Sequence, residues 1–383
     1  MTFKKNIVLL GATGSIGTST LNLIRHKREK FNLIGISAYR KTEELKLISE
    51  EFNVKNVCFF KNHNDVVFDK NIKVMKGLEG LLELASLNCD IVVSGIAGLA
   101  GLMPAYEALK NGNHIAIANK EPIVVAGNIL KECSKNNNVK ILPVDSEHNS
   151  IFQCFNNNQR ENISHITLTA SGGPFLKRSL NSFSNITVEE ALKHPNWEMG
   201  KKISIDSATL INKALEVIEA GYFFELNANQ IQVVIHPESI IHGLVHYKDG
   251  SVLANLALPD MISPLSVAIG YPERYNLNLA KLNLLEISQL NFLKPDLKKF
   301  PGLNFGWHAL NEPNNFSIVL NASNEIAVDL FLKKRIKFTS IIEIIDKCLN
   351  EQKFNSANNL EETLEIDKMS RIFAKKISEK FYV

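Results

Sequence analysis

The spacing of hydrophobic positions changes along the chain and divides it into parts. From residue 7 to about residue 144, short apolar runs rich in β-branched residues alternate with amphipathic stretches of helical period. This alternation is typical of βαβ units on a parallel sheet. We expect strands at 7–10, 33–37, 56–60, 90–94, 114–118 and 140–143, with helices such as 15–26 and 103–111 between them. The pattern predicts an α/β fold with a doubly wound sheet for this part.

The pattern differs after residue 149. Four apolar runs, at 163–169, 232–235, 243–247 and 251–256, are typical of neighbouring strands in a mostly antiparallel sheet with helices set between them. Residues 298–315 are rich in proline, glycine and asparagine and predict a crossing segment. Beyond it, 323–333, 341–350 and 366–381 have the spacing of amphipathic helices. This part of the chain is therefore expected to be α+β, followed by a small helical bundle.

A chain of 383 residues can bury more than one core, because single cores stop growing at roughly 250–300 residues. The patterns predict an N-terminal doubly wound domain over residues 1–149 and an α+β domain over 150–273, with a lid near 193–201. A linker over 274–300 then leads to a C-terminal helical domain over 301–383.

Charge and cysteine content limit the possible binding partners and the cellular compartment of the protein. The formal net charge of +3 is the small difference between 43 basic and 40 acidic residues, so no strong field attracts nucleic acid or a membrane surface. No apolar stretch approaches the roughly 20 residues of a membrane span. The five cysteines lie far apart, which fits a reducing compartment, and the first apolar run starts too early for a preceding signal or transit peptide. We expect a cytoplasmic protein that acts on a small molecule.

A glycine motif follows the first expected strand. Gly11, Gly14 and Gly17 lie in the sequence GATGSIG, which opens the first helix. Glycines at this spacing allow a tight turn and a close backbone approach, while the helix N-terminus offers N–H groups to a pyrophosphate. The motif indicates a dinucleotide site, and the alternative is an ordinary glycine-rich turn.

The end of the second expected strand bears on the choice of cofactor. It reads SAYRK over residues 37–41, without the carboxylate that would bind the ribose hydroxyls of NAD. Arg40 is well placed to clamp the 2′-phosphate of NADPH. The alternative is that Arg40 and Lys41 are only solvated loop charges.

Two later strand ends carry polar clusters, ANKE at 118–121 and VDSEHN at 144–149. Asp145 and Glu147 are two positions apart, so on an extended segment their carboxylates point the same way. Together they can share a hard cation such as Mg²⁺ or Mn²⁺. The alternative is a solvated loop.

A third metal ligand is sought in the segment 206–216, which opens with capping residues and continues as a helix. Asn212, Lys213 and Glu216 are spaced to share one face of that helix. Asn212 and Lys213 suit an anion, and Glu216 suits a cation beside it. The alternative is a polar stripe on a surface helix.

Two loops have the composition to complete such a site. The segment Ser171-Gly172-Gly173 follows an expected strand, so its hydroxyl and backbone N–H groups can cradle a phosphate. A simple tight turn is the alternative. His194 and Trp197, in the segment HPNWEMG, are typical of an active-site lid, although a buried tryptophan beside a hydrogen-bonded histidine gives the same sequence.

Six segments, taken in their order along the chain, resemble those of the 1-deoxy-D-xylulose 5-phosphate reductoisomerases of non-mevalonate isoprenoid biosynthesis. They are GATGSIG, ANKE, PVDSEHN, ASGGPF, HPNWEMG and DSATLINKALE. The resemblance covers nearly the whole chain. It implies a Rossmann NADPH domain, a catalytic α+β domain and a C-terminal helical bundle, assembled as a homodimer. In one departure Ile262 replaces the family's usual arginine, which puts local contacts in doubt more than activity.

The resemblance also implies a role for residues at matching motif positions. Asp145, Glu147 and Glu216 are implied to bind one divalent metal, Mg²⁺ or Mn²⁺. The implied catalytic residues are Lys120, Asp145, Glu147, His194 and Glu216. The implied contacts to a small phosphorylated sugar are Ser146, Glu147, Ser171, His194, Trp197, Ser207, Asn212, Lys213 and Glu216. The implied NADPH contacts are Thr13, Gly14, Ser15, Ile16, Arg40, Lys41, Asn119, Glu121 and Gly200.

The implied reaction has two stages. Metal-chelated 1-deoxy-D-xylulose 5-phosphate rearranges, by retro-aldol cleavage and aldol rejoining, to a branched aldehyde. NADPH then reduces this aldehyde to 2-C-methyl-D-erythritol 4-phosphate. A divalent cation suits the first stage as a Lewis acid on adjacent carbonyl and hydroxyl oxygens, and lid closure excludes water from the fragments.

Two other functions stay open on the sequence alone. A semialdehyde dehydrogenase would also join an NADP-binding domain to an α+β domain, and its cysteine nucleophile would be Cys154. That function gives no reason for the three carboxylates or for the HPNW segment. The other hypothesis is an NADPH-binding redox sensor that has lost turnover, but no residue of the implied site is missing.

Overall fold

The computed structural model describes residues 4–61, 66–197 and 199–383. Glu198, in the expected lid, lies outside the described residues. The chain forms two compact units. Unit 1 consists of Met1–Pro122, Leu130–Asn149 and Asp260–Lys281, and unit 2 of Ile123–Ile129, Ser150–Pro259 and Leu282–Val383. The three-domain division expected from the sequence stays a prediction.

Unit 1 contains a seven-stranded parallel sheet with the order β4-β3-β2-β1-β5-β6-β7. Its strands are β1 Lys5–Leu10, β2 Phe31–Ala38, β3 Asn56–Phe59, β4 Lys73–Lys76, β5 Ile91–Ser94, β6 His114–Ile117 and β7 Ile141–Pro143. The strand order reverses between β1 and β5, and ligands bind beside the carboxyl ends of strands at such a point. The predicted doubly wound α/β fold is confirmed, with β4 as an unpredicted edge strand.

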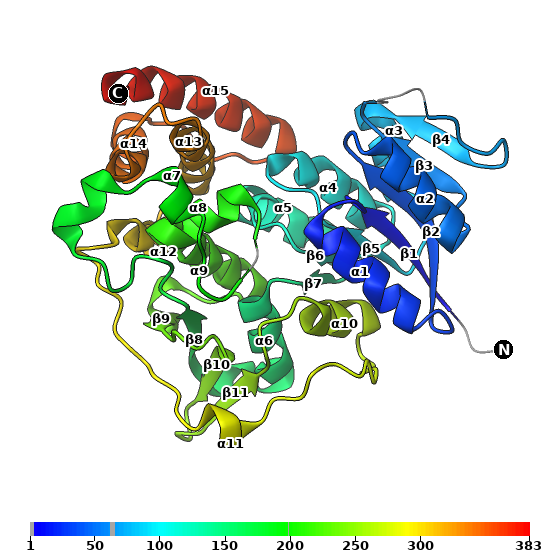
Figure 1. The fold of residues 1–383 in the computed structure, drawn as a ribbon, viewed down its shortest axis with the longest axis horizontal. Coiled ribbons are helices and arrows are strands. Elements are labelled where there is room, and N and C mark those ends of the chain that lie inside the picture. Colours follow the sequence, from blue (N-terminus) through cyan, green and yellow to red (C-terminus); the bar gives the residue numbers. More distant parts are fainter. Residues whose placement is uncertain (1–3, 62–65, 198) are drawn as a thin grey trace. The chain divides into compact units, whose positions relative to one another are not determined.

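Helices follow most strands of this sheet (Figure 1). They are α1 Ser15–His26, α2 Thr42–Phe52, α3 Gly77–Ala85, η1 Leu99–Gly101, α4 Leu102–Lys110, α5 Glu121–Asn136 and α6 Ser146–Cys154. On α1, Leu21, Leu23 and Ile24 are buried, while Arg25 and His26 lie in the last turn. Because an α-helix has 3.6 residues per turn, its apolar residues form one stripe, and this stripe faces the sheet.

Helix α10, Ile262–Gly270, also belongs to unit 1 and packs against α1 (Figure 1). The Lys5 ammonium donates to the carbonyl oxygens of Ile269, Gly270 and Tyr271 at 3.3, 2.9 and 2.9 Å. These last carbonyls of a helix lack intrahelical partners and favour a cation. A residue of strand β1 thus binds the end of helix α10, which lies far along the chain. Ile262, which departs from the family pattern, is the first residue of α10.

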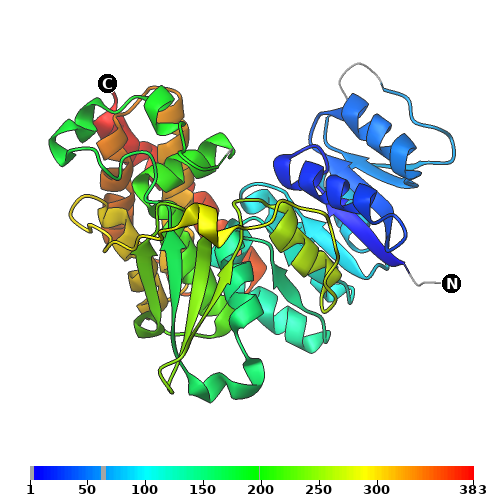
Figure 2. The same ribbon diagram turned by 60° about the horizontal axis from the view of Figure 1, so that its bottom comes forward.

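Unit 2 contains a four-stranded sheet with the order β11-β10-β8-β9 (Figure 2). The strands are β8 Ile163–Ala170, β9 Ile231–Ile235, β10 Ile241–Tyr247 and β11 Val252–Leu256. Strand β10 is antiparallel to both neighbours, and only the β8–β9 pair is parallel. The predicted, mostly antiparallel sheet is confirmed. Ile166, Leu168 and Val245 are fully buried in this sheet.

The helices of unit 2 confirm the predicted terminal bundle, in which α13 packs against both α14 and α15. Before the bundle come η2 Asn157–Asn162, η3 Leu180–Asn185, α7 Val188–Ala191, α8 Lys201–Thr209, α9 Ile211–Phe224, η4 Ala228–Gln230 and α11 Leu284–Ile287. The helices of the last part of the chain are η5 Pro301–Leu303, α12 Asn304–Asn311, α13 Asn315–Leu332, α14 Phe338–Glu351, α15 Leu360–Ser378 and η6 Glu379–Phe381. The prediction of a plain crossing segment at 298–315 is wrong, because α12 lies within it.

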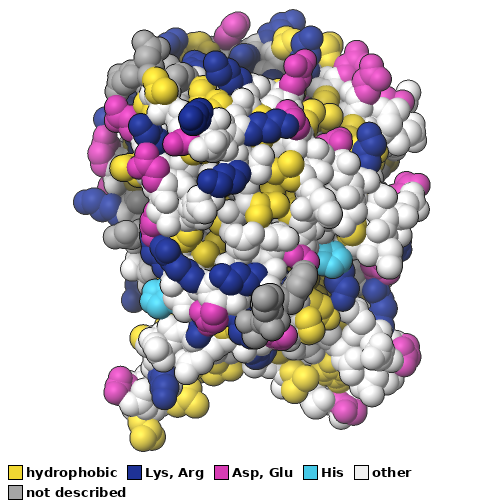
Figure 3. Space-filling view, turned by 90° about the vertical axis from the view of Figure 1, so that its right-hand side faces the viewer, with side chains coloured by type: hydrophobic (Ala, Val, Ile, Leu, Met, Phe, Trp, Pro, Cys, Tyr) yellow, Lys and Arg dark blue, Asp and Glu magenta, His cyan; other side chains and the backbone are white. Residues whose placement is uncertain are grey.

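The surface agrees with a small net charge. On the face drawn in Figure 3, Lys and Arg side chains are interspersed with Asp, Glu and hydrophobic side chains. Among the described residues, no helix combines the length and the apolar character that crossing a bilayer requires.

Candidate active site

The glycine motif forms a tight turn at the carboxyl end of β1. Gly11 has a φ of +84°, and its N–H donates to Ser37 Oγ at 3.1 Å, while the Ala12 N–H donates to the Ser37 carbonyl at 2.8 Å. A Cβ on Gly17 would lie 2.3 Å from the Ala12 carbonyl oxygen. Only glycine allows this approach of turn and helix. Helix α1 begins with no side-chain cap and no acidic residue in its first turn, which suits an anion.

The loops that follow β1, β5 and β6 lie together at the switch point. The Gly95 N–H donates to the Leu10 carbonyl at 2.9 Å. Asn119, after β6, accepts from Ser94 Oγ at 3.2 Å and donates to the Gly98 carbonyl at 3.3 Å. Asn119 is therefore fixed at the edge where the sequence predicted the cofactor.

The basic segment after β2 reaches the glycine turn. Lys41 Nζ donates to the Thr13 carbonyl at 3.4 Å and lies 3.0 Å from Glu44. Arg40 and Lys41 are exposed. Of these two basic residues, Lys41 is therefore shown to border the glycine turn.

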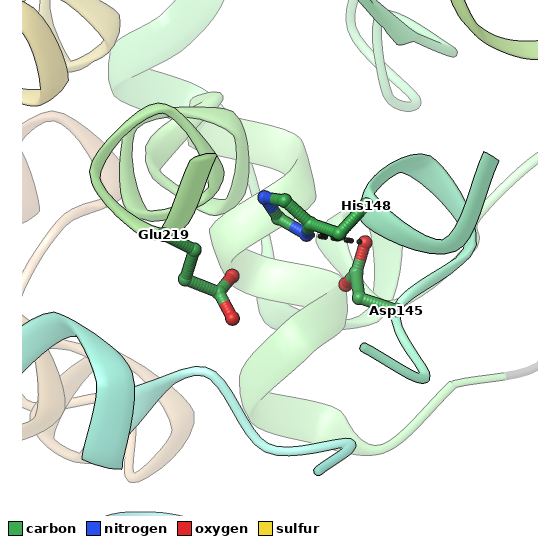
Figure 4. A group of neighbouring side chains, drawn as sticks. All are labelled: Asp145, His148 and Glu219. Atoms are coloured by element: carbon green, nitrogen blue, oxygen red, sulfur yellow. Dashed lines mark hydrogen bonds and ion pairs between the residues drawn. The ribbon is translucent and has the colours of Figure 1, made fainter. Parts of the chain in front are cut away.

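Asp145 follows β7, and its carboxylate contacts three residues of unit 1. It is ion-paired with Lys120 Nζ, and its Oδ1 lies 3.2 Å from His148 Nδ1 (Figure 4). The same oxygen accepts the Glu147 N–H at 3.3 Å. The expected extended D-x-E segment is wrong, because Glu147 lies in the first turn of α6. One carboxylate oxygen of Asp145 and one of Glu147 nevertheless lie within 4.8 Å of each other.

Electrostatics keep Asp145 ionised. Burial alone would raise the pKa of this carboxyl, but Lys120 and the hydrogen bond with His148 outweigh burial and hold the pKa well below its ordinary value. A carboxylate that stays charged at neutral pH is ready to bind a cation.

His148 is a buried neighbour of Asp145 that sequence reasoning did not single out. Its side chain is fully buried and contacts Asp145, while the adjacent Asn149 donates to the carbonyls of Pro143 and Pro264 at 2.9 and 3.1 Å. The available signal was a histidine three positions after Asp145 at the start of a helix, where the two side chains are neighbours.

In unit 2, two helices meet at a sharp break. Leu210, with a φ of 59°, separates α8 from α9. The expectation that Asp206 caps a helix is wrong. Asp206 lies buried inside α8, where its carboxylate contacts Lys202 at 2.8 Å and accepts from Asn324 at 2.9 Å.

Glu216 and its neighbours share one face of α9, as predicted. Asn212 Nδ2 donates to Glu216 Oε1 at 2.5 Å, and Lys213 Nζ is ion-paired with Glu216. The exposed-stripe alternative is wrong, because the relative exposures of Lys213 and Glu216 are only 4% and 1%.

The turn after β8 brings a hydroxyl, a histidine ring and two glycines together. Ser171 Oγ accepts the Gly173 N–H at 3.2 Å and lies 3.0 Å from His194 Nε2. Gly172 and Gly173 have φ values of +86° and +66°, and a Cβ on Gly173 would lie 2.7 Å from the Ser207 carbonyl oxygen. Ser171, His194 and Ser207 are thus brought together.

Backbone hydrogen bonds hold the segment after His194, expected as a lid, against the His194 ring. Its Nδ1 accepts the N–H groups of Asn196 and Trp197 at 3.2 and 3.0 Å. Nδ1 therefore carries no proton, and the ring's proton lies on Nε2, where it is donated to Ser171. The Trp197 ring meets His242 edge to face at 6.1 Å.

Burial lowers the pKa of His194 from 6.5 to about 4. Between these values the unfolded chain binds more protons at this residue than the folded protein. Its contribution to stability is therefore complete above about pH 6.5 and is lost as the pH falls toward about 4. We expect His194→Gln to reduce the acid-induced loss of unfolding free energy by about 1 kcal/mol, allowing for partial exposure of the ring.

The measurement is chemical denaturation of the ligand-free protein at about pH 7 and about pH 5. A matched control is His26→Gln, whose ring is exposed. An acid-induced loss that is the same in wild type and His194→Gln would contradict the assignment.

The expected site residues fall into two groups. Unit 1 carries Thr13, Gly14, Ser15, Ile16, Arg40, Lys41, Asn119, Lys120, Glu121, Asp145, Ser146 and Glu147. Unit 2 carries Ser171, His194, Trp197, Gly200, Ser207, Asn212, Lys213 and Glu216. Most of the expected cofactor residues lie in the first group, and most of the expected phosphate residues lie in the second.

Known proteins resemble this chain over almost its whole length. Family models match residues 7–127, described as 1-deoxy-D-xylulose 5-phosphate reductoisomerase, and residues 141–224, described as the C-terminal domain of that enzyme. A further model, for the DXP reductoisomerase C-terminal domain, matches residues 256–373.

Relatives and solved structures of that name agree. The Clostridium tetani enzyme is 48% identical over 95% of this chain and 97% of its own, and the Thermoanaerobacter pseudethanolicus enzyme is 44% identical over 95% and 97%. The Zymomonas mobilis structure, in complex with NADPH, has a TM-score of 0.91 at 35% identity over 98% and 100%. A DOX-P reductoisomerase complex with NADPH, fosmidomycin and magnesium has a TM-score of 0.91 at 38% identity over 98% of both chains.

Proposed function

This chain belongs to the 1-deoxy-D-xylulose 5-phosphate reductoisomerase family, and from that premise we propose which of its residues carry out the family's reaction. The enzyme is an NADPH- and metal-dependent oxidoreductase that converts 1-deoxy-D-xylulose 5-phosphate to 2-C-methyl-D-erythritol 4-phosphate. The observation that carries the residue assignment is the ionised Asp145 beside Glu147, with carboxylate oxygens within 4.8 Å.

The divalent metal is assigned to Asp145, Glu147 and Glu216. Carboxylate oxygens are the donors that Mg²⁺ and Mn²⁺ prefer, and those of Asp145 and Glu147 lie close enough to share one ion. When bound, the ion supplies Lewis acidity to the substrate's carbonyl and hydroxyl oxygens. Lys120 lies between cofactor and substrate in this proposal, where its ammonium offsets negative charge beside Asp145.

The substrate phosphate is assigned to unit 2. Ser171, Ser207, Asn212 and Lys213 supply hydroxyl, amide and ammonium donors, and α9 begins there without an acidic residue in its first turn. His194 is neutral, so its Nε2 proton serves as a donor beside Ser171. Ser146 binds a substrate hydroxyl, and Trp197 closes over the site and excludes water.

Gly173→Ala tests the phosphate assignment. The added Cβ would lie 2.7 Å from the Ser207 carbonyl oxygen, so the turn must move away from its partners. We expect the KM for 1-deoxy-D-xylulose 5-phosphate to rise about 10-fold, as for a loss of 1.4 kcal/mol of binding, with the KM for NADPH unchanged. Initial-rate kinetics measure both constants.

Gly250→Ala is the matched control, because Gly250 also has a positive φ, +90°, but nothing lies within 4 Å of its added Cβ. The Gly250→Ala variant should lose only about 1–2 kcal/mol of stability, because alanine disfavours the positive φ of this backbone position. Equal substrate KM values in the two variants would contradict the role of the turn.

NADPH is assigned to the turn of unit 1. Thr13, Gly14, Ser15 and Ile16 offer backbone N–H groups to the pyrophosphate at the start of α1. Arg40 and Lys41 face the 2′-phosphate, and Asn119, Glu121 and Gly200 complete the contact set. When bound, NADPH supplies the hydride that reduces the aldehyde.

We further propose a cytoplasmic homodimer that accepts Mg²⁺ or Mn²⁺. All five cysteines are free thiols, which supports a reducing compartment. Strand β11 lies at a sheet edge, and its Val252 and Leu253 are 45% and 49% exposed. An exposed apolar edge strand favours pairing with a second copy. The proposed substrate is a small phosphorylated sugar, without nucleic-acid or membrane partners.

Product analysis tests the function. Enzyme, NADPH, Mg²⁺ and 1-deoxy-D-xylulose 5-phosphate should yield 2-C-methyl-D-erythritol 4-phosphate, identified by NMR, with equimolar loss of NADPH. Cys154→Ser should keep full activity. Loss of activity in Cys154→Ser would favour the semialdehyde dehydrogenase hypothesis, and NADPH binding without any product would favour the redox sensor.

A further inference from the structure

A buried carboxylate inside α8 joins this helix to the terminal bundle. Asp206 is 1% exposed, and its Oδ2 lies 2.8 Å from the ammonium of Lys202, one turn earlier in α8. Its Oδ1 accepts the side-chain amide N–H of Asn324, a fully buried residue of α13, at 2.9 Å. Helices α8 and α13 also pack against each other (Figure 1). Each oxygen of the buried carboxylate thus has a partner, as a charge at this depth requires.

The next residue, Ser207, lies against the glycine turn proposed to bind the substrate phosphate. A Cβ added to Gly173 would lie 2.7 Å from the Ser207 carbonyl oxygen and 3.3 Å from the Ala208 Cα. The backbone of α8 therefore touches the turn directly, with no side chain between them. Any displacement of this part of α8 moves the Ser207 hydroxyl relative to the turn.

Helix α8 depends on tertiary contacts for its position. It has only nine residues, Lys201–Thr209, and begins without a side-chain cap. A helix this short is not stable by itself in water. It also ends at the sharp break at Leu210, so α9 does not continue its axis. The hydrogen bond from Asn324 is therefore well placed to set where α8 lies.

We propose that Asp206 is a positioning residue, through which Asn324 of the helical bundle holds α8 so that Ser207 meets the substrate phosphate. The inference rests on the proposed function, since it presumes that Ser207 binds this phosphate. Asp206 acts through the residue that follows it and has no assigned contact with substrate, metal or cofactor. Loss of the Asn324 contact should therefore weaken binding of the phosphate group and leave the chemical step and NADPH binding unchanged.

Initial-rate kinetics of the full-length enzyme with Mg²⁺ test the proposal on Asn324→Leu, which keeps the size of the side chain and removes its N–H. We expect the KM for 1-deoxy-D-xylulose 5-phosphate and the inhibition constant of inorganic phosphate to rise about 5- to 10-fold, as for one lost hydrogen bond to a charged group. Both kcat and the KM for NADPH should stay within about 2-fold of the wild type, because only binding of the phosphate group is affected.

Asn315→Leu is the matched control. Asn315, the first residue of α13, donates its amide N–H to the Phe354 carbonyl at 2.6 Å. Its Oδ1, like that of Asn324, is buried without a hydrogen-bond partner among the described residues. The control thus removes a similar bond of the same helix and should lower the melting temperature about as much as Asn324→Leu does, with both phosphate constants unchanged. Equal phosphate constants in the two variants would overturn the positioning role.

Exchange of the two side chains keeps the proposal testable if Asn324→Leu does not fold. Asn324→Asp places two carboxylates against each other and should raise the substrate KM at least about 10-fold. Adding Asp206→Asn restores one amide and one carboxylate at the contact and should return the KM to within about 3-fold of the wild type. A folded double variant whose substrate KM stays as high as that of Asn324→Asp would overturn the inference alone. A wild-type enzyme that forms no product would overturn the proposed function and the inference together.

Discussion

Glu216→Gln is expected to lower kcat by about 100-fold or more while NADPH binds as tightly as to the wild type. Glutamine keeps the shape of the side chain but removes the charge proposed to hold the metal. Glu216 is 1% exposed and touches Asn212 and Lys213, so solvent screens the loss of its charge only weakly. Initial rates at saturating Mg²⁺ measure the loss, and quenching of protein fluorescence by NADPH measures cofactor affinity.

The matched control is Glu312→Gln, an exposed glutamate after α12, which should act like the wild type. Raising the Mn²⁺ concentration should restore part of the Glu216→Gln activity, because a weakened metal site fills at higher metal. Unchanged metal-dependent activity in Glu216→Gln would remove this residue from the ligand set.

Asp145→Asn is expected to lower kcat/KM by at least about 100-fold and the apparent affinity for Mn²⁺ by at least about 10-fold. Burial would raise the pKa of Asp145, but Lys120 and His148 hold it well below its ordinary value, so its negative charge persists across the working pH range. The variant also breaks the buried ion pair between Asp145 and Lys120, at a cost of roughly 3 kcal/mol in stability. Metal titration of initial rates gives the affinity, and thermal unfolding gives the stability.

Asp90→Asn separates the two effects. Asp90 accepts the Asn6 N–H at 2.7 Å in the same unit, so its loss affects stability alone. If Asp145→Asn and Asp90→Asn show the same apparent affinity for Mn²⁺, Asp145 is not a metal ligand.

Periodicity was enough to predict most of the sheet in unit 1, because its central strands are buried on both faces and read as continuous apolar runs. Strand β4 was missed since it is an edge strand with a lysine at each end, Lys73 and Lys76, around two apolar residues. Such a short, charged strand gives no period-two signal strong enough to stand out from a loop.

Helix α12 was missed for a different reason. The glycine that suggested a loop, Gly306, lies inside the helix, where a Cβ would come within 2.5 Å of the Ala214 carbonyl oxygen on α9. Glycine is required there by close helix packing rather than by a turn. Sequence alone does not distinguish the two uses because the contacting helix is some 90 positions away in the chain.

The local geometry expected around two of the candidate site segments was wrong. Asp145 and Glu147 were expected on an extended segment, yet they meet across the start of a helix. Asp206 was expected as a cap and is instead a buried anchor to Asn324. Tertiary contacts decide both cases, and local propensity carries no information about them.

The central claim is that metal-bound carboxylates and NADPH act on one phosphorylated sugar, and the absorbance of NADPH tests it most directly. The assay contains 1-deoxy-D-xylulose 5-phosphate with Mg²⁺ or Mn²⁺, an EDTA control, and NADH as the comparison cofactor. We predict oxidation that requires both substrate and metal and that is faster with NADPH than with NADH. Oxidation that persists in EDTA, or none with either metal, would contradict the account.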